Sequence, residues 1–239
     1  MIRLNKYLAD CGIGSRRKCD QFIFEGKIAV NGNIESRLGI KIDEITDTIK
    51  FNGNLLKPVK RFEYIILNKP KGFVTTASDE KGRKTVLELV NSKMRLFPVG
   101  RLDIDTNGLL LLTNDGDLTY KLTHPKFEVD KIYDVRLDRN LEPADKKILE
   151  SGIDLEEGTT SECTIKFPTP GDRSRVKMTL HHGWKRQVRR MFDKFDYKVL
   201  MLKRVGLAFL NLQGLKSGAS RSLTVKEVEQ LKRVCFNGC

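Results

Sequence analysis

Apolar residues along this chain follow two patterns that are typical of strands. Residues 64–67 and residues 109–112 are uninterrupted apolar runs, and each predicts a short buried strand. Residues 175–180 alternate between apolar and polar positions instead, and residues 164–167 do likewise. The pattern therefore predicts a mixed body with many strands and few helices.

Helical spacing is confined to a few segments. Leu4, Tyr7 and Leu8 recur at helical intervals, and Ser15 is suited to cap a second helix. Gly183 is expected to open a further helix, with an apolar stripe on one side and a basic cluster on the other. The stripe consists of Trp184, Val188, Met191 or Phe192, and Phe195, and the cluster consists of Arg186, Arg189 and Arg190.

A change of composition near residues 57–61 predicts a domain boundary. Residues 26–32, which precede it, have the pattern of a turn, a short strand and a second turn. We therefore expect a small N-terminal domain over residues 1–58 and a larger domain over residues 59–239.

The balance of charge favours a polyanionic partner. Lys and Arg number 44 against 31 Asp and Glu, which gives a net charge of +13. Nucleic acid is preferred to a membrane, because no apolar run approaches the roughly 20 residues that span a bilayer. The first residues also lack the apolar core of a signal peptide, so a cytoplasmic protein is expected.

Cysteine spacing gives no sign of a disulfide framework or a metal site. The chain has five cysteines and three histidines, and the only close cysteine pair is Cys235 and Cys239. A zinc site normally needs paired spacing, which is missing here. Reduced thiols, no metal and no cofactor are expected.

A carboxylate two residues after an arginine stands shortly before the apolar run at residues 109–112. A guanidinium such as that of Arg101 near Asp103 would favour the ionised form, which a nucleophile or base needs. Most pairs of this kind are structural ion pairs, so the spacing alone does not assign a reaction.

The surroundings of Asp103 resemble the signature of the pseudouridine synthases, in the branch of bacterial ribosomal RNA enzymes named the RsuA/RluB/RluE/RluF family. Five pieces in the same order carry the resemblance. They are Gly100-Arg101-Leu102-Asp103 with its Thr-Asn-Gly-Leu continuation, Asn68-Lys69-Pro70-Lys71-Gly72, Lys131-Ile132-Tyr133, Gly183 to Met191, and Arg204-Val205-Gly206.

The resemblance implies an α+β fold, with a small N-terminal S4-type (αL) RNA-binding domain followed by a mixed, mainly antiparallel-sheet catalytic domain. The implied reaction isomerises uridine in RNA, with Asp103 as the catalytic carboxylate and no cofactor. Tyr133 would stack on the target base, Leu202 would pack against its other face, and Arg189 would pair with Asp103. Arg101 would complete the substrate-binding set. Whether Asp103 attacks the sugar or removes a sugar proton to form a glycal stays open.

Basic residues in both domains are expected to hold the RNA backbone. In the N-terminal domain these are Arg3, Lys6, Arg16, Arg17 and Lys18, and in the catalytic domain Lys69, Lys71, Lys185, Arg186 and Arg190. Basic residues at a helix N-terminus oppose the helix dipole, so phosphate contact explains residues 16–18 better than helix stability does.

Each of these interpretations has a structural alternative. Tyr133 and Leu202 could be ordinary core residues, Arg189 could pair with Asp193 one helical turn away, and a basic run is commonly a solvated face. His182 stands where relatives usually carry an acidic residue, which alters the charge beside the basic helix. For the whole chain, the alternatives are a non-catalytic RNA-binding or ribosome-assembly factor and a DNA-binding protein.

The expected partner is ribosomal RNA in an assembling ribosomal subunit, and the protein is expected to be a monomer. The stretches at residues 111–118 and 123–126 look more like those of large-subunit enzymes, whereas the compact length and residues 104–106 also suit the small-subunit enzyme. The balance favours 23S over 16S ribosomal RNA.

Overall fold

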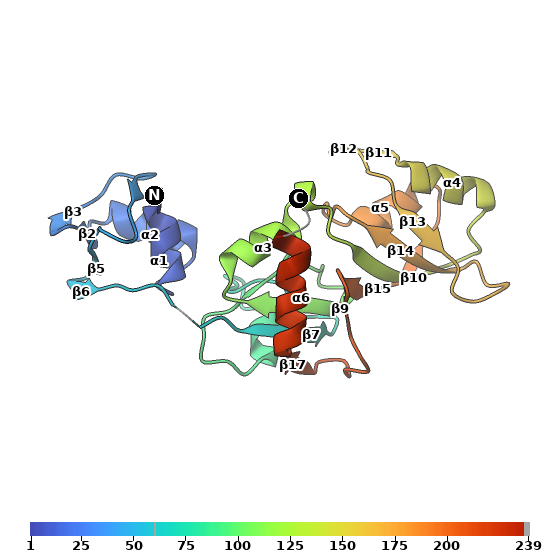
Figure 1. Ribbon diagram of the computed structural model, residues 1–239. Coiled ribbons are helices and arrows are strands. Elements are labelled where there is room, and N and C mark those ends of the chain that lie inside the picture. Colours follow the sequence, from blue (N-terminus) through green and yellow to red (C-terminus); the bar gives the residue numbers. More distant parts are fainter. Residues whose placement is uncertain (60, 237–239) are drawn as a thin grey trace. The chain divides into compact units, whose positions relative to one another are not determined.

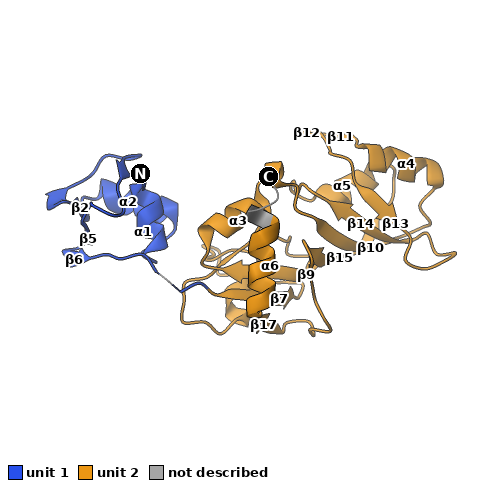
Figure 2. Ribbon diagram, viewed as in Figure 1, with its two compact units in different colours: residues 1–62 blue, residues 63–239 orange. Residues whose placement is uncertain are grey.

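The chain forms two compact units, Met1–Phe62 and Glu63–Cys239 (Figure 2). The computed structural model describes residues 1–59 and 61–236, without the side chains of Cys235 and Phe236. The boundary expected after residue 58 lies a few residues before this division. Cys239 and the Cys235 side chain lie outside the described part, while Cys11, Cys19 and Cys163 are not in disulfides.

The N-terminal unit packs two short helices against small antiparallel strands. In chain order its elements are β1 (Ile2–Arg3), α1 (Leu4–Asp10), α2 (Arg16–Phe24), β2 (Ile28–Val30), β3 (Asn33–Ile34), β4 (Lys41–Ile42), β5 (Ile49–Phe51) and β6 (Asn54–Leu55). The order of its four-stranded sheet is β3-β2-β5-β6, and β1 pairs with β4.

Local sequence explains both helices of this unit. The Ser15 hydroxyl accepts a hydrogen bond from the Lys18 backbone N–H at 3.2 Å, so the expected cap of α2 is confirmed. Leu4, Tyr7 and Leu8 are buried, which confirms the expected apolar side of α1. The unit has its own hydrophobic core, separate from those of the second unit.

The C-terminal unit is built on a single nine-stranded sheet (Figure 1). Its strands are β7 (Tyr64–Lys69), β8 (Phe97–Pro98), β9 (Asn107–Thr113), β10 (Lys131–Leu137), β13 (Thr164–Lys166), β14 (Arg175–Leu180), β15 (Val199–Leu207), β16 (Leu210–Asn211) and β17 (Ser220–Ser222), with a separate hairpin of β11 (Asp154–Leu155) and β12 (Gly158–Thr159). Its helices are α3 (Gly116–Thr123), α4 (Pro143–Ser151), α5 (Gln187–Asp193), α6 (Val225–Phe236) and the short 3-10 helices η1 (Val86–Leu89) and η2 (Pro125–Phe127).

The sheet is mixed and mainly antiparallel. Its main path runs β13-β14-β10-β15-β9-β7-β17, with β8 paired to β9 and β16 paired to β15. All these pairs are antiparallel except β15 with β9, where Lys203 lies opposite Asn107. The parallel pair places β15, from late in the sequence, in the middle of the sheet.

The four leucines at residues 109–112 explain why β9 occupies a central position. Leu110 and Leu112 enter one hydrophobic cluster, and Leu109 and Leu111 enter another on the opposite face. A strand covered on both faces needs apolar residues at every position, so the run predicted from the sequence is confirmed as a buried strand. Helices α3 and α6 lie side by side over one face of β7 and β9 (Figure 1).

Helix α5 begins later than its apolar stripe predicts. The sequence places its start at Gly183, whereas the structure begins it at Gln187. Arg186 has a φ of 53° and the buried Gln187 side chain accepts a hydrogen bond from the Trp184 backbone N–H, so residues before Gln187 form a loop. Trp184 therefore belongs to this loop and not to the helix.

Candidate active site

One cavity of about 630 Å³ opens in the C-terminal unit and collects residues from distant parts of the sequence. Its wall includes Arg101, Asp103, Lys131, Tyr133, Leu202 and Arg204. These come from the loop before β9 and from the adjacent strands β10 and β15. The cavity thus brings together four residues predicted for the site, namely Asp103, Arg101, Tyr133 and Leu202.

The loop before β9 is held in place by hydrogen bonds to its backbone carbonyls. The Thr106 N–H donates to the Asp103 carbonyl at 3.0 Å, which closes a tight turn. The Leu102 carbonyl accepts from the Thr75 hydroxyl at 2.7 Å. Gly108 has a φ of 113°, and a Cβ there would overlap the Arg204 backbone on β15. The glycine is therefore needed where β9 and β15 approach each other.

Lys69 is not a phosphate contact, so that prediction was wrong. The residue is fully buried at the end of β7, and its ammonium donates to the carbonyls of Pro70, Asp103 and Thr106 at 3.2, 3.0 and 2.8 Å. Burial lowers the pKa of Lys69 to about 8, against the opposing effect of the Asp105 and Asp103 charges. Lys69 instead fixes the backbone of the loop that carries Asp103.

The two carboxylates of this loop have different surroundings. Asp103 is half-buried and lines the cavity. Asp105 is bound by two guanidiniums, with Arg189 Nη2 at 3.1 Å and Arg186 Nη1 at 3.3 Å. Burial raises the pKa of Asp105, but the charges of Arg189 and Arg186 outweigh it and hold that pKa below its usual range.

Arg189 therefore pairs with Asp105, and the expected partner Asp103 is not the one observed. Its Nη1 also donates to the Val199 carbonyl at 2.9 Å, so the side chain joins α5, β15 and the Asp103 loop. The turn from Asp103 to Thr106 separates the two carboxylates although a single residue lies between them. The sequence could not show which of the two aspartates pairs with Arg189, because only one residue separates them and both are far from Arg189 in the sequence.

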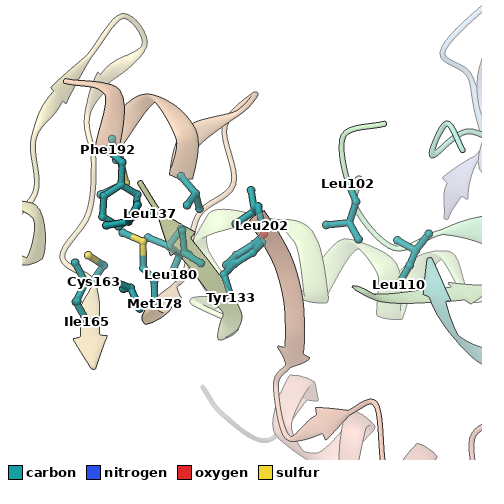
Figure 3. Close-up of a cluster of buried hydrophobic side chains, with 14 of the residues drawn as sticks. Leu102, Leu110, Tyr133, Leu137, Cys163, Ile165, Met178, Leu180, Phe192 and Leu202 are labelled. Atoms are coloured by element: carbon teal, nitrogen blue, oxygen red, sulfur yellow. The ribbon is translucent and has the colours of Figure 1, made fainter. Parts of the chain in front are cut away.

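Tyr133 and Leu202 form an apolar wall of the cavity. Val135 on β10 lies opposite Leu202 on β15, and Tyr133 is two residues earlier on the same face. Figure 3 shows the Tyr133 ring next to Leu202. They are 8% and 4% exposed, yet both line the cavity, so an aromatic face and an aliphatic side chain adjoin the space beside Asp103.

Two cations at the cavity, the buried Arg204 and the half-buried Lys131, were not predicted as site residues. Arg204 is 2% exposed, and its Nε donates to the Leu109 carbonyl at 2.8 Å. Lys131 donates to the carbonyls of His181 and Val129, and burial, together with the Arg204 charge, lowers its pKa to about 8. Lys131 shares a strand face with Tyr133. A lysine on an otherwise apolar strand face is the sequence feature that could have identified Lys131 as a site residue.

Several predicted RNA contacts surround this cavity. Lys185 and Arg186 are exposed and line it, and Lys71 is exposed on the loop after β7. Arg101, which was predicted for the substrate-binding set, is also exposed and lines the cavity. Arg190 forms a two-point ion pair with Glu157, at 2.7 and 2.8 Å.

The basic residues predicted to contact RNA in the N-terminal unit lie on its first strand and its helices. Arg3, Arg16, Arg17 and Lys18 are exposed, and Lys6 pairs with Asp10 at 3.2 Å. Arg16, Arg17 and Lys18 form the first turn of α2. The cation cluster predicted at this helix end is therefore present on the surface of the unit.

These features define a class of protein. A carboxylate, an aromatic side chain and an aliphatic side chain share a cavity with cations at its mouth, and a separate small unit carries a second basic surface. This combination is typical of an enzyme that takes a base out of a nucleic acid strand.

Comparison with known proteins gives the family. Residues 63–194 match the family described as RNA pseudouridylate synthase, and residues 2–47 match the S4 domain. The chain is 44% identical over 245 residues to ribosomal large subunit pseudouridine synthase B of Bacillus subtilis, covering 100% of this chain and 98% of that protein. It is also 34% identical to the dual-specificity RNA pseudouridine synthase RluF of Escherichia coli, covering 99% and 80%.

A crystal structure of a pseudouridylate synthase has a similar fold, with a TM-score of 0.70 and 30% identity, covering 97% of this chain and 100% of that one. The chain belongs to the RNA pseudouridine synthase family and carries an N-terminal S4 domain. Among the helices of residues 1–59 and 61–236, none has the length and apolar character to cross a membrane.

Proposed function

We propose that this chain isomerises a uridine of 23S ribosomal RNA to pseudouridine, with Asp103 as the catalytic carboxylate. The observation that carries the target is the 44% identity, over the whole chain, to a synthase named for the large ribosomal subunit. The position of Asp103 in the cavity, beside Tyr133 and Leu202, supports its role.

The reaction exchanges one bond to the ribose for another. The bond between C1′ and N1 of uracil breaks, the ring turns, and a bond forms between C1′ and C5. The proton on C5 is lost and N1 gains one, so the reaction is neither a hydrolysis nor a redox change. Asp103 starts it either by attacking C1′ or by removing a sugar proton, and both routes need the carboxylate ionised.

The other cavity residues position the base. Tyr133 stacks on the extruded uracil and Leu202 packs against it, which replaces part of the stacking lost from the RNA, roughly 1–3 kcal/mol per base. The pair between Arg189 and Asp105 fixes the loop beside Asp103. Arg189 is therefore a positioning residue in the resting enzyme.

Basic side chains hold the surrounding phosphates. In the catalytic unit we assign this role to Lys71, Lys185, Arg186 and Arg190, and in the S4 unit to Arg3, Lys6, Arg16, Arg17 and Lys18. Arg101, on the wall of the cavity, is assigned to the substrate-binding set. Binding of this kind weakens steeply as salt is raised, because each neutralised phosphate releases counterions. We place the protein in the cytoplasm as a monomer that acts on an assembling ribosomal subunit.

The test is chemical mapping of pseudouridine across ribosomal RNA from cells that lack the gene. The strain is complemented with wild type, with Asp103→Asn, or with Asp193→Asn as a matched control, since Asp193 is exposed on α5. We expect one 23S site to disappear on deletion and to return with wild type and Asp193→Asn only.

Other results would redirect the proposal. A restored site in 16S ribosomal RNA would refute the 23S target, and restoration by Asp103→Asn would refute the role of that carboxylate. No change at any site on deletion would favour the non-catalytic RNA-binding alternative.

A further inference from the structure

Three aromatic rings gather where α3 meets η2, and the proposed chemistry uses none of them. The ring centroids of Tyr120 and His124 are 4.9 Å apart, and Phe127 lies 5.7 Å from Tyr120 and 6.2 Å from His124. Tyr120 is 49% exposed and His124 is exposed, whereas Phe127 is partly buried against the core. We call these three residues the aromatic platform.

The helix pattern explains why this platform faces solvent. Leu118 and Leu122 are one turn apart and fully buried, while Tyr120 and His124 are one turn apart on another side of the same segment. His124 Nδ1 accepts a hydrogen bond from the Lys126 backbone N–H at 3.3 Å, which caps η2 and sets the direction of the imidazole. The His124 imidazole is therefore oriented before any partner arrives.

A lysine side chain lies beside the aromatic platform. The Lys126 ammonium lies 4.7 Å from the Phe127 centroid and 5.7 Å from that of Tyr120. Such contacts are weak at exposed sites, so Lys126 can leave the rings for a phosphate at small cost. Aromatic faces with adjacent cations are what proteins use to bind unpaired nucleotides, because bases stack on the rings and phosphates meet the cations.

The platform adjoins the catalytic cavity. Thr123, which is three residues after Tyr120 and therefore its neighbour on the helix surface, lines the cavity. A Cβ on Gly100 would lie 3.6 Å from Thr123 Cγ2, and Gly100 opens the loop that carries Asp103. A nucleotide on the platform would therefore be a near neighbour of one in the cavity.

We propose that Tyr120, His124 and Phe127 stack an unpaired base that flanks the target uridine, and that Lys126 binds its phosphate. The inference rests on the proposed ribosomal RNA substrate. By holding a neighbour of the extruded nucleotide, the platform fixes which uridine reaches Asp103 and favours targets in single-stranded segments.

The test measures kcat, KM and RNA affinity of the full chain with a 23S ribosomal RNA transcript. Loss of one stacked base predicts that Tyr120→Ala raises KM and Kd by roughly ten- to a hundredfold, with kcat at saturating RNA unchanged. Tyr120→Phe keeps the ring and stays near wild type. Lys126→Ala lowers the salt dependence of binding by about one phosphate contact, and Lys147→Ala, an exposed lysine on α4, does not.

A purely structural role gives a different result. If Tyr120→Ala lowers the melting temperature but leaves KM and Kd unchanged, the platform only supports the junction of α3 and η2, and the proposal is overturned. Turnover by the wild-type enzyme tests the substrate separately. If the wild-type enzyme does not turn over the 23S transcript, the proposed target is refuted. If it does, and Tyr120→Ala has the same kinetics, only the proposal for the platform is refuted.

Discussion

Replacing Lys69 with methionine separates two roles that the same lysine could have. Methionine fills a similar volume but lacks the ammonium, so the carbonyls of Pro70, Asp103 and Thr106 lose their donor. Each buried carbonyl left unpaired costs about 1–3 kcal/mol. The variant also avoids the desolvation cost of a buried charge, which is several kcal/mol. The two effects partly cancel in the free energy of unfolding, so the main expected effect is a shift of the loop.

The loop geometry decides the effect on turnover. A displacement of about 1 Å at a catalytic group costs on the order of a hundredfold in rate, so Lys69→Met is expected to lower kcat by about that factor. Its Kd for RNA should stay near wild type, because the side chain is fully buried. Single-turnover kinetics at saturating RNA and filter binding measure the two quantities.

Lys71→Met is the matched control, since Lys71 is exposed two residues further on, in the loop after β7. It should weaken binding and reduce the salt dependence by about one contact while leaving kcat unchanged. If Lys69→Met binds RNA more weakly but turns over at the wild-type rate, the positioning role of Lys69 is refuted and a phosphate contact by Lys69 is supported instead.

Three further predictions concern stability. Gly108→Ala forces a Cβ against the β15 backbone at a positive φ and should destabilise the protein by about 2 kcal/mol or more in urea unfolding, whereas Gly116→Ala, with open space at its Cβ, should not. Ser15→Ala removes the cap of α2 and should cost about 1 kcal/mol, read from urea unfolding followed by signals of the N-terminal unit; an unchanged midpoint would contradict the cap. Lys69 loses its proton near pH 8 when folded but near pH 10.5 when unfolded, so the stability of wild type relative to Lys69→Met should rise by up to about 3 kcal/mol across that window and stay flat below it.

Periodicity predicted the parts of the fold that depend on local pattern. The leucine run of β9, the alternation of β14 and the Ser15 cap are each set by neighbours in sequence, and all three are confirmed. Helix α5 was mispredicted at its start because the apolar stripe includes Trp184. In the structure the Trp184 backbone N–H donates to the Gln187 side chain, Arg186 has a positive φ, and the helix begins only at Gln187.

The sequence motifs predicted which residues line the site, but not which side chains contact one another there. The cavity does collect Asp103, Tyr133 and Leu202, but their roles stay predictions until the mapping experiment. The burial of Lys69 depends on carbonyls that lie up to 37 residues further on, and a lysine between two turn residues gives no local sign of it. The pairing of Arg189 with Asp105 likewise depends on the turn from Asp103 to Thr106, and the spacing of residues does not tell which carboxylate of that turn faces the arginine.

The central place of β15 has a consequence for the order in which the protein matures on the ribosome. The N-terminal core uses residues from Ile2 to Leu56 and is complete early in synthesis. Strands β9 and β10 lack their common neighbour until residues 199–207 have emerged, and Leu202 and Arg204 are missing from the cavity until then. Because units fold as synthesis completes them, the nascent chain gains an RNA-binding surface long before it gains a cavity, and catalysis is the last property to appear.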